Sequence, residues 1–429
     1  MARFLISTMS ATGTVHSTLP VAAALTDAGH EVLWHTWPEW AEAIERTGAT
    51  FVAARHTPSL TELPAAPDPG TSGRRGAISV MRKHLVERMA GQVADYENIH
   101  RTRPVDALVV GLTCLGAQAF FELRGVPWAS VGLSPLGLAS ADTPPFGSGK
   151  PPPAGPADRA YNWGYHRLAR IAQSGLTRDY NRHRALLGLP RLRPGRSVVD
   201  YLTSPQLHLL GSTPGMEFPR RRWPKHVHFV GPLLPPPPPP RDLPRWWPEL
   251  DRGRTIVHIT QGTIAVDPKV LTRPAMRGLA DLDALDVVTT PDPGDLPRVP
   301  RNVRVASFIP HGLLLPRVDV MVTNGGFQGV KMALAHGVPM VIAPWGNDQP
   351  DIAARLAWAG AAVNLGVRKP RPEVVGDAVA TVLGDPGYRR AAERIRDEFA
   401  EYGNGHRAVP LLERLATGAV KGSAHGDRR

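Results

Sequence analysis

Short uninterrupted hydrophobic runs alternate along this chain with segments whose hydrophobic residues recur every three or four positions. Residues 4–7 form the first run, which predicts a buried strand. The next segment repeats hydrophobic side chains at the spacing of one helix face, at Leu19, Ala22, Leu25 and Ala28. We expect Ser17 or Thr18 to cap this helix and Gly29 to end it. A strand at 32–35 completes a βαβ unit, and such units favour a parallel sheet covered by helices.

The second half of the chain repeats this rhythm more regularly. A helix is predicted over 268–282, others follow the last two strands, and strands are predicted at 255–260, 286–290, 318–323 and 339–343. Between the halves stand six consecutive prolines, Pro235–Pro240, which form a stiff extended spacer. The chain is therefore predicted to be an α/β protein with an N-terminal domain over 1–232, a linker over 233–250 and a C-terminal domain over 251–429.

Composition narrows the class of protein. The 429 residues suffice for two domains of ordinary size, and shares of 42% hydrophobic and 21% charged residues are those of a soluble globular protein. No hydrophobic run approaches the roughly 18 residues needed to cross a bilayer, and the N-terminus lacks the hydrophobic core of a signal peptide. Cys114 is the one cysteine, which excludes an internal disulfide. We therefore expect a cytoplasmic protein with no transmembrane segment.

The net charge of +12 does not predict a nucleic-acid-binding protein. Most basic residues are arginines scattered through the chain, with short clusters at Arg220–Arg222 and in the C-terminal tail. A nucleic-acid interface would instead show one basic stripe with a recognisable motif. We expect no nucleic-acid partner. The positive charge either attracts a small anionic ligand or reflects a compositional bias towards Ala, Arg, Gly and Pro.

Candidate phosphate chemistry follows the strand at 318–323. This strand ends at Thr323, the pair Gly325-Gly326 turns the chain, and a helix is predicted to begin near Phe327. Free backbone N–H groups and the positive end of the helix dipole point the same way at such a start, which makes it an anion site. The simpler alternative is a tight turn that binds nothing.

Other candidate groups follow neighbouring strands. Asp348 and Gln349 come after the strand at 339–343, and Gly262 and Thr263 come after the first strand of the second half. Ligands of open α/β sheets bind at the edge where the carboxyl ends of the strands meet. A carboxylate and an amide suit the hydroxyl groups of a sugar. Asp348 alternatively caps the helix that starts beside it.

These residues resemble the donor-binding signature of the family-1 glycosyltransferases, which include the bacterial antibiotic and macrolide glycosyltransferases. Further similarities extend in order over nearly the whole chain, at Thr12–Pro20, Ala28–Val32, Val230–Leu234, Ile259–Thr263 and Phe308–His311. The resemblance implies the GT-B fold, in which two Rossmann-like domains with parallel sheets face each other across a cleft. It also implies that the last helix, at about 404–417, packs back on the N-terminal domain.

The same resemblance implies an inverting transferase that moves a hexosyl or deoxyhexosyl unit from a UDP- or dTDP-sugar to a small natural-product acceptor. The diphosphate would lie at Asn324, Gly325, Gly326 and Phe327, the sugar at Asp348 and Gln349, and the nucleotide base near Phe308 and Ile309. Asn324 stands where the family has a histidine. An amide donates a hydrogen bond but carries no charge, so the expected loss is about 1 kcal/mol. No metal or other cofactor is expected.

The catalytic base is where the sequence departs from the family. Inverting transfer needs a base that takes the acceptor proton, and the family supplies a histidine oriented by an aspartate. The matching positions hold Thr14 and Gly111. His16 lies two residues further on, where a small loop shift would let it act instead. Three possibilities stay open: His16 is the base, the acceptor is acidic enough to need little help, or the protein no longer transfers sugar.

The acceptor is expected in the N-terminal domain, near Gly111 and the long loops over 57–76 and 134–160. Trp37 follows a strand and would line a flat hydrophobic pocket, with a place in the core or on the surface as the alternative. The alternative function is a catalytically impaired accessory protein that partners another glycosyltransferase. The sequence also leaves a homodimer open.

Overall fold

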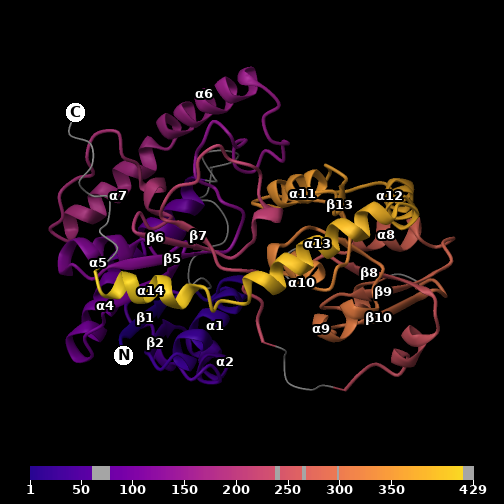
Figure 1. The fold of residues 1–429 in the computed structure, drawn as a ribbon, viewed down its shortest axis with the longest axis horizontal. Coiled ribbons are helices and arrows are strands. Elements are labelled where there is room, and N and C mark those ends of the chain that lie inside the picture. Colours follow the sequence, from indigo (N-terminus) through magenta and orange to yellow (C-terminus); the bar gives the residue numbers. More distant parts are fainter. Residues whose placement is uncertain (60–77, 237–241, 263–266, 297–298, 419–429) are drawn as a thin grey trace.

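Two parallel β-sheets form the centres of two domains that lie side by side (Figure 1). The computed structural model describes residues 1–59, 78–236, 242–262, 267–296 and 299–418. The predicted α/β architecture with two parallel sheets is confirmed. The linker expected at 233–250 remains a prediction, and most of its proline run, 237–240, lies outside the described residues.

The first sheet has seven parallel strands in the order β3-β2-β1-β4-β5-β6-β7. Its strands are β1 Arg3–Ser7, β2 Glu31–Thr36, β3 Thr50–Ala53, β4 Ala107–Gly111, β5 Trp128–Gly132, β6 Leu207–Leu210 and β7 Val227–Phe229. The helices of this half are α1 Thr12–Asp27, α2 Ala41–Glu45, α4 Met89–Thr102, α5 Gly116–Arg124, α6 Pro156–Ala172 and α7 Ser174–Leu186, with a π-helical turn at Arg82–Val86.

The second sheet has six parallel strands in the order β10-β9-β8-β11-β12-β13. Its strands are β8 Thr255–Thr260, β9 Ala284–Thr289, β10 Val303–Ala306, β11 Val320–Thr323, β12 Met340–Ile342 and β13 Ala362–Asn364. The helices are α8 Thr272–Gly278, α9 His311–Leu314, α10 Phe327–Ala335, α11 Gln349–Trp358, α12 Pro372–Gly384, α13 Pro386–Tyr402 and α14 Ala408–Ala416. Short 3₁₀ turns complete the chain at Pro38–Trp40, Val198–Tyr201, Pro214–Met216, Trp247–Asp251, Pro293–Asp295 and Leu315–Arg317.

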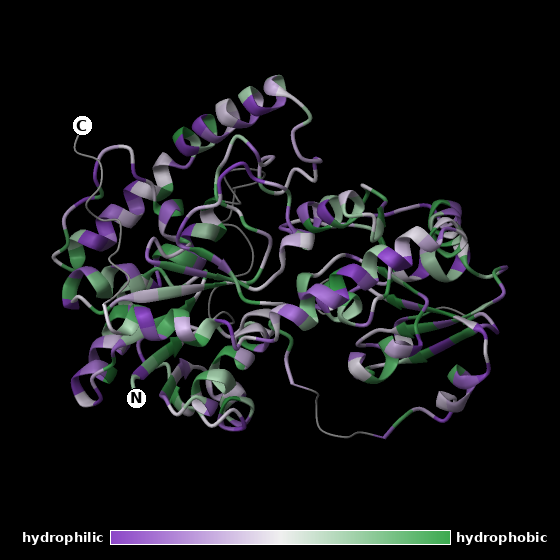
Figure 2. Cartoon of the chain, in the orientation of Figure 1, coloured by the Kyte–Doolittle hydropathy of each residue, from purple (hydrophilic) through white to green (hydrophobic). Residues whose placement is uncertain are grey.

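Hydrophobic residues gather in the strands of both sheets, and the surrounding helices carry mixed faces (Figure 2). In each sheet the strand order reverses beside the first strand of the domain, at β1–β4 and at β8–β11. Ligands of such sheets bind where the order reverses, outside the carboxyl ends of the strands. A ligand is therefore expected near the helices that follow these strands, α1 and α10.

The predicted N-terminal cap of α1, Ser17 or Thr18, is wrong, because the helix begins nearly two turns earlier, whereas it ends at Asp27, just before the predicted Gly29. Its first residue is Thr12, and Ala11 precedes it without a side-chain cap. The hydroxyl of Thr18 donates to the carbonyl of Thr14 one turn back, at 2.9 Å, and the hydroxyl of Ser17 donates to Gln328. Both hydroxyl groups therefore serve the helix interior and a contact with α10 instead of a helix start. The helix expected over 268–282 is also shorter, since only the residues of α8 are helical.

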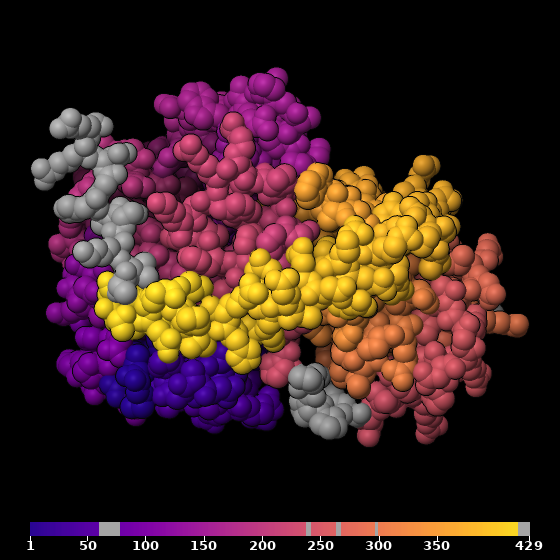
Figure 3. All heavy atoms as spheres, viewed as in Figure 1, coloured from indigo at the N-terminus to yellow at the C-terminus, as the bar shows by residue number. Residues whose placement is uncertain are grey.

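The C-terminal helices cross from the second domain to the first. In Figure 3 the chain from α13 to α14 forms a continuous band over both domains. Ala408, Leu412 and Leu415 of α14 are completely buried in one hydrophobic cluster with Phe4 and Ile6 of β1. The end of the chain thus completes the core of the N-terminal domain.

This packing predicts that α14 stabilises the N-terminal domain. Leu412→Ala removes a fully buried side chain from the cluster and should lower the free energy of unfolding by about 2–5 kcal/mol. Urea denaturation measures this change. Arg414→Ala on the exposed face of the same helix should change it by less than about 0.5 kcal/mol. Equal losses in the two variants would contradict the packing.

Candidate functional site

The two domains meet where α1 and α10 approach each other. The hydroxyl of Ser17 in α1 donates to Oε1 of Gln328 in α10 at 2.9 Å, and the amide nitrogen of Gln328 donates to the carbonyl of Leu233 at 3.3 Å. Three residues further along α10, Nζ of the buried Lys331 donates to the carbonyl of Gly211, which follows β6, at 3.4 Å. The N-terminal parts of both helices, and the strand ends that lead into them, therefore face the domain boundary.

The turn between β11 and α10 has the geometry expected of an anion site. Gly325 adopts φ +85°, and a Cβ there would lie 2.8 Å from Cγ2 of Ile342, so that glycine is required on both counts. The side chain of Asn324 is buried and accepts a hydrogen bond from the N–H of Gly326 through Oδ1 at 3.3 Å. Gly326 precedes α10 and no side chain caps the helix. The N–H of Gly325 donates to the Thr323 hydroxyl at 3.3 Å. The N–H groups of the first turn of α10, which begins at Phe327, are thus left for a ligand.

Gln349, the second residue of the predicted pair Asp348 and Gln349, lies against this turn. A Cβ on Gly325 would be 3.7 Å from the carbonyl oxygen of Gln349 and 3.8 Å from its Cβ. Asp348 precedes α11 but its carboxylate makes no capping hydrogen bond, so the capping alternative is wrong. Oε1 of Gln349 accepts from the N–H of Trp345 at 2.8 Å. This bond fixes the amide group and leaves its nitrogen as a donor.

Gly262 brings a third strand end to the same place. A Cβ on Gly262 would lie 3.2 Å from the amide nitrogen of Asn324, and the glycine has φ +74°. The ends of β8, β11 and β12 therefore converge within a few ångströms. Thr263, the other residue expected there, lies outside the described residues.

Burial changes the acidity of Asp348. Loss of water around the carboxyl group, with a smaller contribution from the charge of Asp351, raises the pKa of Asp348 to about 6. An ionised carboxylate here costs free energy until hydrogen-bond donors reach it. Hydroxyl groups of a bound sugar are donors of this kind.

Of the two residues expected near a nucleotide base, Phe308 is exposed and Ile309 is buried. Phe308 is 53% exposed, on the segment between β10 and α9. Ile309 is buried in the hydrophobic core of the second domain, and so is Phe327 at the start of α10. The side chains of Ile309 and Phe327 therefore face the core and are not available to a ligand.

The structure brings Thr14 and Gly111 together. A Cβ on Gly111 would lie 2.9 Å from Cγ2 of Thr14, so the end of β4 and the first turn of α1 face each other without a titratable group between these two residues. The predicted loop shift that would bring His16 here does not hold. Both residues lie inside α1, where positions two apart point about 160° away from each other. The His16 ring packs edge-on against the Trp40 ring, with 5.6 Å between the ring centres. Burial lowers the pKa of His16.

Trp37 belongs to the core of the first domain. It is 8% exposed and packs in the hydrophobic cluster of Leu5, Leu33 and Tyr96, which is the alternative that the sequence left open. It therefore does not line a pocket. Of the long loops expected around the acceptor, residues 60–76 lie outside the described residues.

One histidine–carboxylate pair at this edge of the first sheet was missed in the sequence. Nδ1 of His56, just beyond β3, lies 2.8 Å from Oδ1 of the buried Asp95 in α4, and the His56 side chain is 49% exposed. Burial would raise the pKa of Asp95, but hydrogen bonds from His35, His56 and Thr57 more than offset it and hold the pKa well below its usual range. The carboxylate fixes the His56 ring, yet 39 residues of sequence separate the pair and no motif marks it.

Over the described ranges, no three His, Cys, Asp or Glu side chains are grouped so that they would hold a metal ion. Nor does any helix in that part of the chain have the length and hydrophobicity to cross a membrane.

Known proteins share sequence with nearly the whole chain. The Erythromycin biosynthesis protein CIII-like, C-terminal domain matches residues 273–415. The 4'-demethylrebeccamycin synthase of Lentzea aerocolonigenes is 41% identical over 422 residues, which cover 96% of this chain and 99% of that protein. UDP-glycosyltransferase 2 of Phaeomoniella chlamydospora is 32% identical over 418 residues and covers 88% of each chain.

Solved structures share the fold. The glycosyltransferase of kitacinnamycin superposes with a TM-score of 0.75 at 21% identity, over 96% of this chain and 98% of the other. The glycosyltransferase VinC in complex with dTDP superposes with a TM-score of 0.68 at 23% identity, over 97% and 99%. The predicted GT-B arrangement of two Rossmann-like domains is confirmed.

The raised pKa of Asp348 predicts a pH-dependent cost to stability in the free protein. Because the folded state holds this proton more tightly than the unfolded state, stability falls as pH rises from about 4 to about 6. Asp348→Asn avoids this loss and should be more stable than the parent by roughly 1–2 kcal/mol at pH 7. Thermal unfolding at pH 4 and pH 7 measures the difference, which should narrow at pH 4. A variant that is less stable at pH 7 would contradict the account.

Proposed function

We propose a donor, a stereochemical course and an acceptor class for this chain, which belongs to the GT-B glycosyltransferases of antibiotic and natural-product biosynthesis. The enzyme takes a hexosyl or deoxyhexosyl unit from a UDP- or dTDP-sugar and transfers it with inversion to a small natural product. The observation that carries the proposal is the convergence of Asn324, Gly325 and Gly262 with Gln349 at one helix start.

The diphosphate is proposed to lie at the turn before α10. As the acceptor oxygen attacks the anomeric carbon from the opposite face, the bond to the diphosphate breaks and its electron pair leaves with the phosphate oxygen. Negative charge then grows beside the free N–H groups of the helix start and the amide of Asn324, which stabilise it. Asp348 and Gln349 bind the sugar hydroxyls on the neighbouring segment.

The acceptor is proposed to lie beside Thr14 and Gly111, on the N-terminal side of the cleft. The family's histidine and aspartate are both absent there, and His16 points away toward Trp40. We propose that the acceptor is a phenol or a carboxylic acid that loses its proton to solvent water, so that little general-base catalysis is needed. The relatives are named as enzymes, which gives no support to the alternative of an accessory protein.

Nucleotide binding tests the donor site. The protein should bind UDP or dTDP in isothermal titration calorimetry, and Asn324→Ala should weaken binding about fivefold, or about 1 kcal/mol, because one hydrogen bond to phosphate is lost. Asn98→Ala, on the surface of α4, serves as the matched control and should bind as the parent does. Unchanged affinity in the Asn324 variant would contradict the assignment.

The acidity of the acceptor tests the second part of the proposal. Release of UDP or dTDP should be fastest with phenols of pKa near 7 and should fall steeply toward a pKa of 10 (about tenfold or more), since the oxygen must arrive nearly deprotonated. His16→Ala should keep the parent rate within about threefold. A loss of two orders of magnitude in this variant would instead identify His16 as the base.

A further inference from the structure

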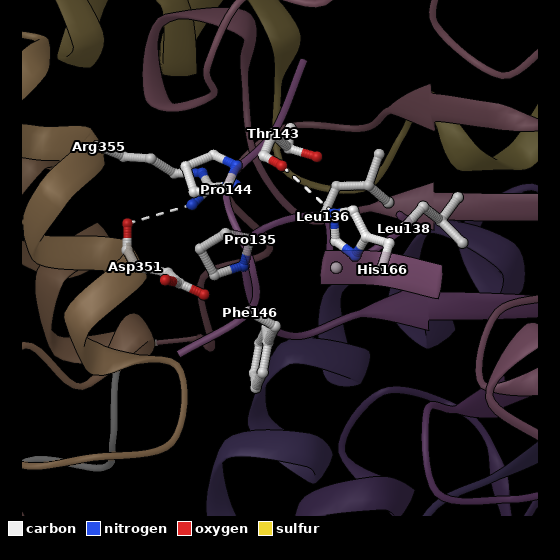
Figure 4. A pocket seen from close by; sticks show the side chains of 10 residues that line it. Pro135, Leu136, Leu138, Thr143, Pro144, Phe146, His166, Asp351 and Arg355 are labelled. Carbon is white, nitrogen blue, oxygen red and sulfur yellow. Dashed lines mark hydrogen bonds between the residues drawn. The ribbon is translucent and has the colours of Figure 1, made fainter. Parts of the chain in front are cut away.

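The long loop after β5 rests on the helix that begins with the proposed sugar-binding pair. Asp351, in the first turn of α11, accepts the N–H of Gly147 at 2.7 Å through one carboxylate oxygen and the N–H of Gly149 at 3.1 Å through the other. About 200 residues separate the partners, and the contact spans the domain boundary. Figure 4 shows Asp351 and Arg355 of α11 facing the part of the loop that contains Pro135, Pro144 and Phe146.

The glycines of this loop allow the close approach. Gly147 and Gly149 have φ of +77° and +61°. A Cβ on Gly149 would lie 3.0 Å from Cβ of Pro350, and a Cβ on Gly147 would lie 3.4 Å from the carbonyl of Asn347. The Gly147–Gly149 segment therefore covers the chain on both sides of the sugar-binding pair.

A second contact holds the base of the same loop. Glu217 accepts the N–H of Leu136 at 2.9 Å through one oxygen and Nε of Arg355 at 2.9 Å through the other. Glu217 and Arg355 are both buried, and the Arg355 guanidinium lies 4.5 Å from the centre of the Phe218 ring. The base of the loop thus stays attached to α11 by a contact that does not involve the Asp351 carboxylate. The Asp351 carboxylate contacts only the tip of the loop, at Gly147 and Gly149.

We propose that Asp351 is a positioning residue for the donor sugar: its carboxylate pins Gly147–Gly149 of the N-terminal domain over Asn347–Gln349 and makes this loop tip one wall of the sugar site. The inference rests on the proposed function, because it takes Asp348 and Gln349 as the groups that bind the sugar. Gly147 and Gly149 meet Asn347, Pro350 and Asp351, and not the diphosphate turn at Asn324–Gly326. Asp351 therefore acts on the sugar and not on the nucleotide diphosphate.

Two variants test the contact between Asp351 and the loop tip, one on each partner. Asp351→Ala removes the acceptor oxygens, and Gly149→Ala inserts a methyl group against Pro350. Each should raise the KM and the Kd for the UDP- or dTDP-sugar at least tenfold, while the Kd for UDP or dTDP alone stays within twofold. Asp351→Asn keeps one acceptor oxygen and should show a smaller effect. The control is Asp397→Ala, an exposed carboxylate on α13, which should change neither affinity.

Proteolysis measures the release of the loop tip directly and needs no ligand. Phe146 is half exposed and precedes Gly147, so chymotrypsin can cut between them. Release of the loop tip should increase this cleavage about fivefold or more in Asp351→Ala, with an unchanged circular dichroism spectrum.

Unchanged cleavage together with unchanged sugar affinity would overturn the inference. Equal weakening of UDP and UDP-glucose would also overturn it, because the residue would then act on the whole site. A parent protein that binds neither UDP nor dTDP would contradict the proposed function itself. The chymotrypsin experiment would still test the contact between Asp351 and the loop tip, because it needs no ligand.

Discussion

The contact between the glycine turn after β11 and the first residue of α11 is the constraint on which the candidate site depends. Gly325 has no room for a side chain because Ile342 and Gln349 occupy the space around it. This contact places a helix start with free N–H groups beside a carboxylate and an amide. A diphosphate and a sugar are joined in one donor molecule, so their binding groups must be this close to act together.

The two domains are held in register around that contact by several independent connections. Ser17 and Gln328 join the two helices that leave the central strands, and α14 completes the core of the first domain with residues from the end of the chain. Glu217 and Arg355 form a buried ion pair across the same boundary. Desolvation can offset the attraction within a buried ion pair, but removal of one partner leaves an unpaired buried charge, so the two groups must stay together. These connections together fix the position of one domain relative to the other.

Much of the second domain could be predicted from the sequence, because its signals are local. The strand at 255–260 was predicted to the residue, and the start of α10 at Phe327 followed from the two glycines before it. The first domain was harder. Ser17 and Thr18 look like caps in sequence, but their hydroxyls bond to a helix 311 residues away and to the preceding turn. The contacts of Asp351 with Gly147 and of His56 with Asp95 join residues that no periodic pattern relates.

The central claim is that a nucleoside diphosphate binds at the start of α10 with its sugar toward α11. A crystal structure of the protein grown with dTDP or UDP tests this most directly. The account predicts phosphate oxygens within hydrogen-bond distance of the backbone N–H groups in the first turn of α10 and of the Asn324 side-chain amide nitrogen. A diphosphate bound elsewhere, with this turn empty, would contradict it.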